Sequence, residues 1–234
     1  MSATHPHDDR YQRRLSRGRR SWDFVSGWAG WVPRWRVPLT GLLRDQLELR
    51  AGQSVLDVGC GRGELLGLLR EEVGPEGRAV GIDYSAGMVR RAQERIDHEG
   101  WGNVEVHTGD ASRPAFGQAA IDGPTFDAAV ATFAISAMPD VISAVQNVHT
   151  ALKPGGRFLV LDLRLAPNGW SRVLAWFLGL WYRLLAGWTG QDVLSALRHA
   201  FPTVEVIKGR RARGGSDPGW VFIAVATKEK AAST

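Results

Sequence analysis

The sequence predicts an α/β fold: a doubly wound, seven-stranded and mostly parallel sheet, with an N-terminal helical extension and an inserted aromatic helix after the fifth strand. Three observations support this class. Short apolar and β-branched runs alternate with helical patterns between residues 54 and 161, which is typical of a parallel sheet with helical crossovers. A glycine-rich turn follows the first strand, and acidic residues end several strands. The length of 234 residues and the apolar fraction of 44% suffice for one large domain.

The chain begins with a polar, arginine-rich stretch, residues 1–20, that lacks apolar periodicity. The net charge of the chain is +5, and six arginines crowd the stretch from Arg10 to Arg20. Dense like charge disfavours packing, so we expect a disordered arm. A second interpretation is contact with a polyanionic partner such as membrane headgroups. Residues 21–234 are expected to form a single domain.

Seven strands are expected where short apolar or β-branched runs lie between turn residues. They are Ser54–Val58, Ala79–Ile82, Val104–His107, Phe126–Ala131, Arg157–Leu161, Val204–Lys208 and Val221–Thr227. The segments with helical periodicity are Leu39–Leu49, Leu65–Glu72, Ser85 to about Glu99, Pro139–Leu152, Trp170–Trp188 and Gln191–Ala200. A serine side chain can accept from the free N–H groups of a first helical turn, so Ser85 is expected to be an N-cap.

The turn after the first strand has glycines at alternate positions, Gly59, Gly61 and Gly63. Such a turn lets the backbone pass close to a ligand, because no Cβ is in the way, and it aims backbone N–H groups at that ligand. One alternative is a tight turn without any ligand. Another is a dinucleotide site, whose G-x-G-x-x-G/A fingerprint would place Glu64 at its last position, where a side chain would crowd a pyrophosphate.

Polar side chains stand at or just beyond the ends of four predicted strands. They are Asp57, Asp83, Asp110 and Thr132. In an open parallel sheet, ligands bind beyond the carboxyl ends of the strands, near the point where the strand order reverses. A single strand-end aspartate is often only a turn residue. Three aspartates and a threonine at four successive strand ends predict a ligand crevice.

The segment from Asp57 to Gly63 resembles motif I of the class I S-adenosylmethionine (SAM)-dependent methyltransferases. The other segments that match are Gly81–Ser85, Gly109–Ala111, Phe126-Asp127 and Leu152–Arg157. The segment Leu152–Arg157 is similar to a sequence motif of small-molecule methyltransferases, including those of ubiquinone and menaquinone synthesis. The resemblance covers about residues 50–163 and implies a Rossmann-like fold.

The resemblance implies SAM as the cofactor and S-adenosylhomocysteine as the product, with no metal. Asp83 would accept hydrogen bonds from the ribose hydroxyls, Asp110 would accept from the adenine amino group, and the apolar faces of Tyr84 and Met88 would pack on adenine. Trp22-Asp23 stands where the subgroup often has Tyr-Asp. The residues expected to contact SAM are Asp57, Gly59, Cys60, Gly61, Asp83, Tyr84, Met88, Asp110, Ala111, Thr132, Phe133 and Trp22.

Eight of the ten tryptophans fall in two clusters, residues 22–35 and 170–188. We expect residues 21–50 and 165–190 to cover a site for a small or lipid-like apolar acceptor. The aromatic residues expected to contact that acceptor are Trp28, Trp31, Phe177 and Trp181. Ordinary helix packing is one alternative. A membrane-surface patch formed with the arginine-rich arm is another.

Methyl transfer gains most from the alignment of donor and acceptor, and some acceptors also need a base. The candidates for catalytic roles are Asp162 and Arg164, expected just after the fifth strand near the mouth of the crevice, and Asp23. The sequence also allows Trp22, Asp23 and Tyr11 to fold over that mouth. None of the six histidines is well placed for this role, so proximity and desolvation alone are the alternative.

Composition excludes several classes. No run of 18 uncharged apolar residues is present, so no ordinary transmembrane helix is expected. A single cysteine suits a reducing compartment, and we expect a cytoplasmic protein, with peripheral membrane contact as an open alternative. The segment Thr132–Ser136 is not an Asn/Asp-Pro-Pro-Tyr motif, so no nucleic-acid partner is expected. The oligomeric state stays open.

The function expected from these observations is transfer of a methyl group from SAM to a specialised metabolite, a quinone precursor or a lipid. The alternative is a SAM-binding protein of the same fold that transfers no methyl group, such as a cyclase or a regulator.

Overall fold

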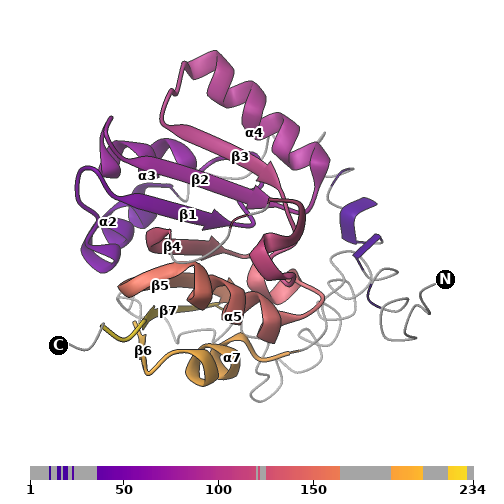
Figure 1. The fold of residues 1–234 in the computed structure, drawn as a ribbon, viewed down its shortest axis with the longest axis vertical. Coiled ribbons are helices and arrows are strands. Elements are labelled where there is room, and N and C mark those ends of the chain that lie inside the picture. Colours follow the sequence, from indigo (N-terminus) through magenta and orange to yellow (C-terminus); the bar gives the residue numbers. More distant parts are fainter. Residues whose placement is uncertain are drawn as a thin grey trace, which may run out of the picture.

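The computed structural model describes residues 36–119, 121, 125–163, 191–207 and 221–230, and from the N-terminal region Tyr11, residues 15–16 and 18–20, and Asp23. Within these residues, seven strands form one sheet in the order β3-β2-β1-β4-β5-β7-β6 (Figure 1). The strands are β1 (Ser54–Val58), β2 (Arg78–Asp83), β3 (Val104–Thr108), β4 (Phe126–Thr132), β5 (Leu152–Leu163), β6 (Thr203–Val206) and β7 (Val221–Thr227). The predicted seven-stranded α/β sheet is confirmed.

The sheet is parallel from β1 to β5, and β7 runs antiparallel to both of its neighbours, β5 and β6. The chain builds outward from β1 to β3 and then returns to β4 on the other side of β1. The strand order therefore reverses between β1 and β4. In such sheets this reversal opens a crevice at the carboxyl ends of the strands.

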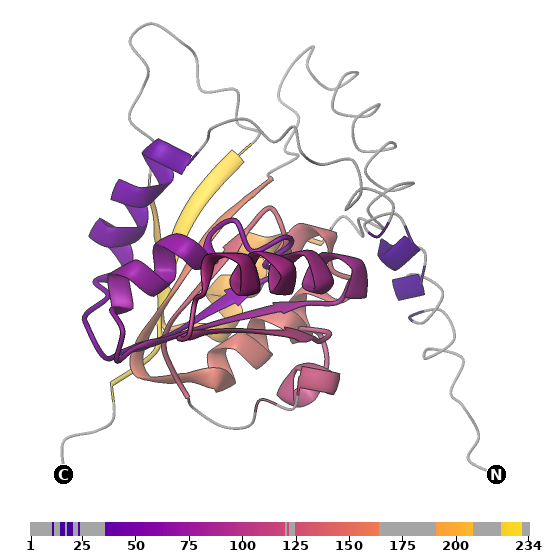
Figure 2. The same cartoon turned by 90° about the horizontal axis from the view of Figure 1, so that it is seen from above.

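Helices pack on both faces of the sheet (Figures 1 and 2). The α-helices are α2 (Arg36–Leu47), α3 (Leu66–Val73), α4 (Ala86–Glu99), α5 (Val141–Ala151) and α7 (Val193–Ala200), and two 3₁₀ turns are η1 (Pro114–Ala119) and η2 (Ile135–Ala137). Successive residues of a strand point to opposite faces. Accordingly, Leu56 packs in the hydrophobic core that contains α5 and α7, whereas Val55 packs in the core that contains α2 and α3.

Polar side chains cap three of these helices. Ser85 caps α4 as expected, and its Oγ accepts from the Met88 N–H at 3.1 Å. Asp140 caps α5 and Asp192 caps α7. The helix predicted over Pro139–Leu152 therefore begins only at Val141, because Asp140 has an extended backbone and serves as its cap.

Helix α2 corrects one prediction about the cover of the acceptor site. Its side chains Leu43 and Leu47 are buried in the core beneath the sheet, and Figure 1 shows the helix at the end of β1 opposite to the arrowhead. The part of residues 21–50 that forms α2 thus stabilises the sheet and does not cover the crevice. The aromatic helix predicted over Trp170–Trp188 lies outside the described residues.

Strand β5 is longer than predicted. It begins at Leu152 and ends at Leu163, so it includes the Lys153–Gly156 turn sequence. The register between β4 and β5 shifts at Phe126/Ala128, and Gly155 has a φ of +79°. A bulge with a glycine in the left-handed region lets the strand continue through residues that otherwise end strands. At the other end, pairing with β7 continues through Asp162 and Leu163, so Asp162 lies inside the strand and not after it.

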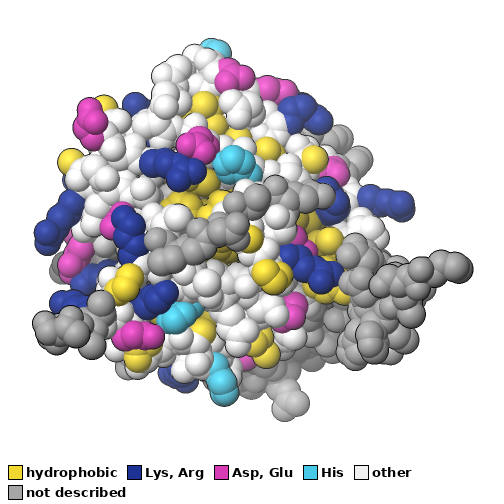
Figure 3. Space-filling view, viewed as in Figure 1, with side chains coloured by type: hydrophobic (Ala, Val, Ile, Leu, Met, Phe, Trp, Pro, Cys, Tyr) yellow, Lys and Arg dark blue, Asp and Glu magenta, His cyan; other side chains and the backbone are white. Residues whose placement is uncertain are grey.

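The described N-terminal residues also differ from the expected disordered arm. Tyr11, residues 15–16 and 18–20, and Asp23 have helical backbone, and they lie beyond the carboxyl ends of the strands in both views (Figures 1 and 2). Elsewhere, acidic and basic side chains are interspersed over the face shown in Figure 3. No helix among the described residues is long and apolar enough to cross a membrane.

Candidate active site

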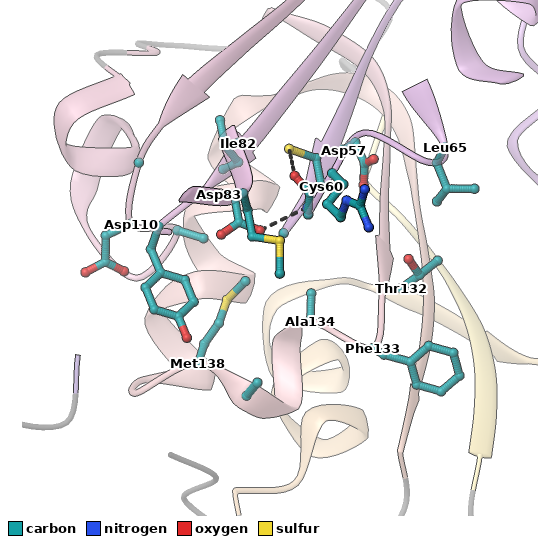
Figure 4. Close-up of a pocket in the computed structure, with 18 of the residues that line it drawn as sticks. Asp57, Cys60, Leu65, Ile82, Asp83, Asp110, Thr132, Phe133, Ala134 and Met138 are labelled. Carbon is teal, nitrogen blue, oxygen red and sulfur yellow. Dashed lines mark hydrogen bonds between the residues drawn. The ribbon is translucent and has the colours of Figure 1, made fainter. Parts of the chain in front are cut away.

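A cavity of about 370 Å³ lies at the carboxyl ends of the central strands (Figure 4). Its lining comes from the glycine turn, the end of β2, the loop after β3 and the segment after β4. The lining residues are Asp57, Gly59, Cys60, Gly61, Arg62, Glu64, Leu65, Ile82, Asp83, Tyr84, Met88, Gly109, Asp110, Ala111, Thr132, Phe133, Ala134, Ala137, Met138 and Pro139. Of the twelve residues predicted to contact SAM, eleven are in this set. The twelfth, Trp22, lies outside the described residues.

The glycine turn needs glycine for both conformation and space. Gly59, Gly61 and Gly63 have φ values of +73°, +55° and +73°, a region that residues with a Cβ rarely adopt. A Cβ on Gly59 would lie 2.4 Å from the Cβ of Ala134. The turn after β1 and the wall after β4 are thus in direct contact, and only a glycine fits between them.

The sequence predicts that the backbone N–H groups of this turn point at a ligand, but four of them donate to acceptors within the protein. Gly59 and Cys60 donate to the Ile82 carbonyl at 2.8 and 3.0 Å, and Gly63 donates to the Cys60 carbonyl at 2.9 Å. Gly61 donates to the Asp83 carboxylate at 3.0 Å. These four donors are already used within the protein. A pyrophosphate is held by free N–H groups, so this use of the donors argues against the dinucleotide alternative.

Acidic side chains surround the middle of the cavity. Asp57 is only 1% exposed, and its Oδ1 is a buried atom that has no hydrogen-bond partner among the residues that the structure describes. Burial, followed by the charges of Asp83 and Glu64, raises the pKa of Asp57 to about 8. An unpartnered buried carboxylate oxygen beside two further acids is costly unless a cation meets it. The cavity therefore suits a positively charged ligand.

Asp83 is the last residue of β2 and is 9% exposed. One carboxylate oxygen accepts from the Gly61 N–H, and the other accepts from the Ser85 N–H at 2.9 Å. Burial raises the pKa of Asp83 to about 6, while these two N–H groups act in the opposite direction. Asp83 thus connects the glycine turn to the start of α4 and still borders the cavity, as Figure 4 shows.

The far end of the cavity is bordered by Tyr84, Met88, Asp110 and Ala111. Asp110 is held at both backbone groups: its N–H donates to the Phe116 carbonyl at 3.1 Å, and its carbonyl accepts from Arg113 at 2.9 Å. The predicted combination of an aromatic ring, a thioether and a carboxylate is present at this end. It fits a flat heterocycle that carries a hydrogen-bond donor.

The opposite wall is mainly apolar. It is formed by Ala134, Ala137 and Met138 from the η2 region, after Thr132 at the end of β4. Phe133 has a φ of +52° and donates its N–H to the Leu161 carbonyl at 2.7 Å. In Figure 4 its ring turns away from Asp83 and Asp110. This wall makes the cavity amphipathic, with acids on one side and aliphatic groups on the other.

Cys60 also lines the cavity, but it is unsuited to nucleophilic chemistry. Burial first, and then the nearby charges of Asp57, Asp83 and Glu64, raise the pKa of its thiol well above the ordinary value. The side chain packs against Gly81, where an added Cβ would lie 2.8 Å from its sulfur. Cys60 is therefore a small packing residue of the turn.

The structure does not bring the predicted catalytic residues together in the cavity. Asp162 is fully buried and accepts from both the N–H and the hydroxyl of Ser136, at 2.9 and 2.6 Å. It holds the η2 wall from behind and is absent from the cavity lining. Asp23 bonds at the start of α4 and also lies outside the lining. Arg164 falls outside the described residues, as do Trp28, Trp31, Phe177 and Trp181.

Replacing Asp162 by alanine is expected to reduce the free energy of unfolding by about 3 kcal/mol, because two hydrogen bonds to a charged acceptor are lost and the buried Ser136 donors lose a partner. Denaturant unfolding of Asp162→Ala, Ser136→Ala and the double variant measures this coupling. A positioning role predicts that Ser136→Ala costs less in the Asp162→Ala background. Unfolding within about 0.5 kcal/mol of wild type, with activity lost, would instead favour the predicted catalytic role.

Several lining residues were missed from the sequence. Glu64 was considered only as an obstacle to a pyrophosphate, although its position one residue after the turn could have suggested a fourth acid in the crevice. Met138 and Pro139 follow a short 3₁₀ turn, which has no periodic signal. Among the described residues, no group of three or more His, Cys, Asp or Glu side chains could hold a metal ion.

Comparisons with known proteins agree with this geometry. A family model described as methyltransferase domain matches residues 49–188, more than half of the chain. The chain is 37% identical over 120 residues to nocamycin O-methyltransferase of Saccharothrix syringae, covering 51% of this chain and 41% of that protein. It is 32% identical over 167 residues to 2-phytyl-1,4-naphtoquinone methyltransferase of Thermosynechococcus vestitus, covering 68% and 70%. The chain spans about half the length of the first curated relatives it matches.

Among solved structures, YcgJ protein from Bacillus subtilis is similar in fold, with a TM-score of 0.63 at 21% identity, over 82% of this chain and 98% of that one. The family match includes the glycine turn, the strand-end acids and the η2 wall that form the cavity. The chain belongs to the methyltransferase domain family, and its fold is that of the class I SAM-dependent methyltransferases.

Proposed function

We propose that this protein transfers the methyl group of SAM to a small, largely apolar acceptor such as a quinone precursor or a specialised metabolite. The observation that carries the proposal is the buried, unpartnered Oδ1 of Asp57, which stands beside Asp83 and Glu64 at the end of β1. SAM carries a sulfonium and an ammonium, so it supplies the positive charge that this acidic cavity lacks. The Asp57 oxygen fits the ammonium of the amino-acid tail.

The remaining lining fits the other parts of the cofactor. Asp83 stands at the end of β2, next to the glycine turn, where its carboxylate accepts from ribose hydroxyls as well as from Gly61 and Ser85. Tyr84 and Met88 provide apolar contact for adenine, and Asp110 accepts its amino group. When bound, SAM supplies an electrophilic methyl group on a positively charged sulfur.

The acceptor is proposed to enter along the apolar wall of Ala134, Ala137 and Met138. The relatives named as O- and naphthoquinone methyltransferases support an apolar small molecule. This wall orients the acceptor, and the closely packed turn and wall exclude water. Such positioning supplies much of the rate of a displacement reaction. Cover of this side by Trp28, Trp31, Phe177 and Trp181, and contact with a membrane surface, stay predictions.

A two-stage experiment tests the function. Calorimetric titration with SAM, S-adenosylhomocysteine and NAD is expected to give binding for the first two only. Incubation with SAM labelled in its methyl group and a panel of hydroxylated quinones and phenolic metabolites is then expected to give a labelled product by mass spectrometry. Binding of NAD without SAM would overturn the cofactor assignment. SAM binding without transfer to any member of a broad panel would favour the non-transferring alternative, a cyclase or a regulator.

Replacing Asp83 by alanine is expected to weaken SAM binding roughly ten- to hundredfold, because a hydrogen bond to a charged acceptor contributes about 1.5–3 kcal/mol. The melting temperature should fall as well, since the same carboxylate holds Gly61 and Ser85. Asp83→Asn is the matched variant, because it keeps one acceptor oxygen and the side-chain shape. Wild-type affinity in a folded Asp83→Ala protein would show that Asp83 is only a turn residue.

A further inference from the structure

Tyr11 contacts the carboxylate at the far end of the cavity although it lies 99 residues away in sequence. Its hydroxyl donates to Oδ2 of Asp110, while Oδ1 accepts from the Ser112 N–H at 3.0 Å. The backbone N–H and carbonyl of Asp110 are bonded within the loop after β3. With the backbone fixed, the carboxylate of Asp110 can move only by rotation of the side chain. Tyr11 restrains one carboxylate oxygen, and Ser112 restrains the other.

Tyr11 is itself held in place. It is partly buried, and the Arg113 guanidinium lies over its ring, 4.3 Å from the ring centre. Burial and the hydrogen bond to Asp110 raise the pKa of the phenol above its ordinary value. The hydroxyl therefore keeps its proton and acts as a donor over the whole physiological range.

The same N-terminal segment contacts the rim of the cavity at two further points. Gly18 is buried so close to Tyr84 that a Cβ added to it would lie 2.8 Å from the Tyr84 hydroxyl. Asp23 accepts from the Ser85 hydroxyl at 2.5 Å and from the Gly87 N–H at 3.0 Å. The three contacts follow the rim from the loop after β3 to the start of α4, beyond the carboxyl ends of the strands (Figure 1).

Tyr11 does not itself line the cavity, whereas Asp110 does. The phenol thus approaches the carboxylate from outside and leaves the cavity open. A carboxylate oxygen has two lone pairs, so each oxygen of Asp110 can accept from its present donor and from a second donor inside the cavity. This arrangement favours a role for Tyr11 in orienting Asp110 over one in blocking it.

We propose that Tyr11 is a positioning residue that fixes the Asp110 carboxylate as the acceptor for the exocyclic amino group of adenine, and so gives the site its preference for an adenine-containing ligand. The inference rests on the proposed function, because it assumes that the adenosine of SAM occupies the cavity. Without the phenol, the carboxylate would rotate, and its hydrogen bond to the amino group would be formed in only part of the population.

The test compares two ligands, S-adenosylhomocysteine and its analogue in which hydrogen replaces the amino group of the purine. Calorimetry on the full chain is expected to give wild-type protein a roughly ten- to hundredfold preference for the amino-bearing ligand, the range for a hydrogen bond to a charged acceptor. Tyr11→Phe is expected to lose about tenfold in affinity for S-adenosylhomocysteine and to bind the analogue as wild type does. The preference then shrinks, although the ring over Arg113 is kept.

Asp23→Ala is the matched control, because it loosens the same segment at its contact with Ser85 without touching Asp110. This variant should reduce the affinity for both ligands by the same factor and leave the preference for the amino-bearing ligand unchanged. Thermal unfolding of each variant verifies the fold. Equal weakening of both ligands by Tyr11→Phe would mean that Tyr11 only anchors the segment, and tighter binding of S-adenosylhomocysteine would mean that Tyr11 competes with the ligand. Either result overturns the inference, whereas a wild type that binds neither ligand overturns the proposed function.

Discussion

Gly59→Ala is expected to reduce SAM affinity by more than a hundredfold. The backbone of Gly59 has a φ of +73°, which costs an alanine about 1–2 kcal/mol. The added Cβ would also lie 2.4 Å from the Cβ of Ala134, and neither atom belongs to a flexible side chain. The turn after β1 or the wall after β4 must therefore move. Both line the cavity, so either movement changes the site that we propose for the cofactor and the acceptor.

Calorimetric titration with SAM measures the loss, and thermal unfolding measures the accompanying strain. Gly52→Ala is the matched control: Gly52 has a φ of +83°, but no heavy atom of the described part of the chain would come within 4 Å of its added Cβ, and it does not line the cavity. It should show a similar backbone cost with unchanged SAM affinity. A folded Gly59→Ala protein that binds SAM as wild type does would contradict the role assigned to the turn.

Gly61 and Gly59 differ in what an added Cβ would meet. A Cβ on Gly61 would meet only Glu64, at 3.8 Å, because the space in front of it is the cavity. A valine there would crowd the ligand more than the protein. The two glycines thus separate two reasons for a glycine-rich turn: close packing between protein segments at Gly59, and close approach of a ligand at Gly61.

The fold could be predicted because its signals are local. Strand β1 was predicted with its observed bounds, and Ser85 was recognised as a cap from the residue type and the helical pattern after it. The strand-end acids followed from one topological rule: parallel strands place their carboxyl ends along one edge. Asp57, Asp83 and Asp110 accordingly line one cavity. Local pattern and sheet topology were enough to bring together the acidic side of the cavity.

The parts that could not be predicted depend on contacts distant in sequence. Antiparallel pairing of β5 with β7 continues through Asp162 and Leu163. It places Asp162 in a buried strand and not at the expected mouth of the crevice. A position of Tyr11 over the crevice mouth was considered, but its bond to Asp110 joins segments with no shared pattern, so the partner could not be predicted. An arginine-rich composition predicts disorder, but composition alone does not reveal that Tyr11 within this stretch and Asp23 just after it have bonding partners elsewhere in the fold.

The affinity for SAM is expected to rise with pH between pH 6 and 7.5. The pKa of Asp57 is raised to about 8, so in the free protein this carboxyl is mostly protonated over that range. The ammonium of SAM, whose own pKa is close to that of an α-amino group at about 8, stays mostly charged there. Binding the cation favours ionised Asp57 and releases its proton. The affinity then gains up to about tenfold for each pH unit below the pKa.

The raised pKa of Asp57 also makes the stability of the protein depend on pH, but stability falls with rising pH where the affinity for SAM rises. The pKa of Asp57 is higher in the folded protein than its ordinary value of 3.8, so between about pH 4 and 8 the folded state binds more protons than the unfolded state. The free energy of unfolding contributed by Asp57 therefore falls as pH rises through that window. Bound SAM should oppose this fall, because the cation compensates the ionised carboxylate.

Asp57→Asn separates these effects from those of other groups, since it has the same shape and cannot ionise. The variant should bind SAM weakly and with little dependence on pH above the titration of Asp83 near pH 6, and without ligand it should be more stable than wild type at pH 8. Calorimetry in buffers of different ionisation enthalpy counts the protons released. A wild-type affinity that is flat from pH 6 to 7.5, with no proton release, would mean that Asp57 does not meet the charge of the cofactor.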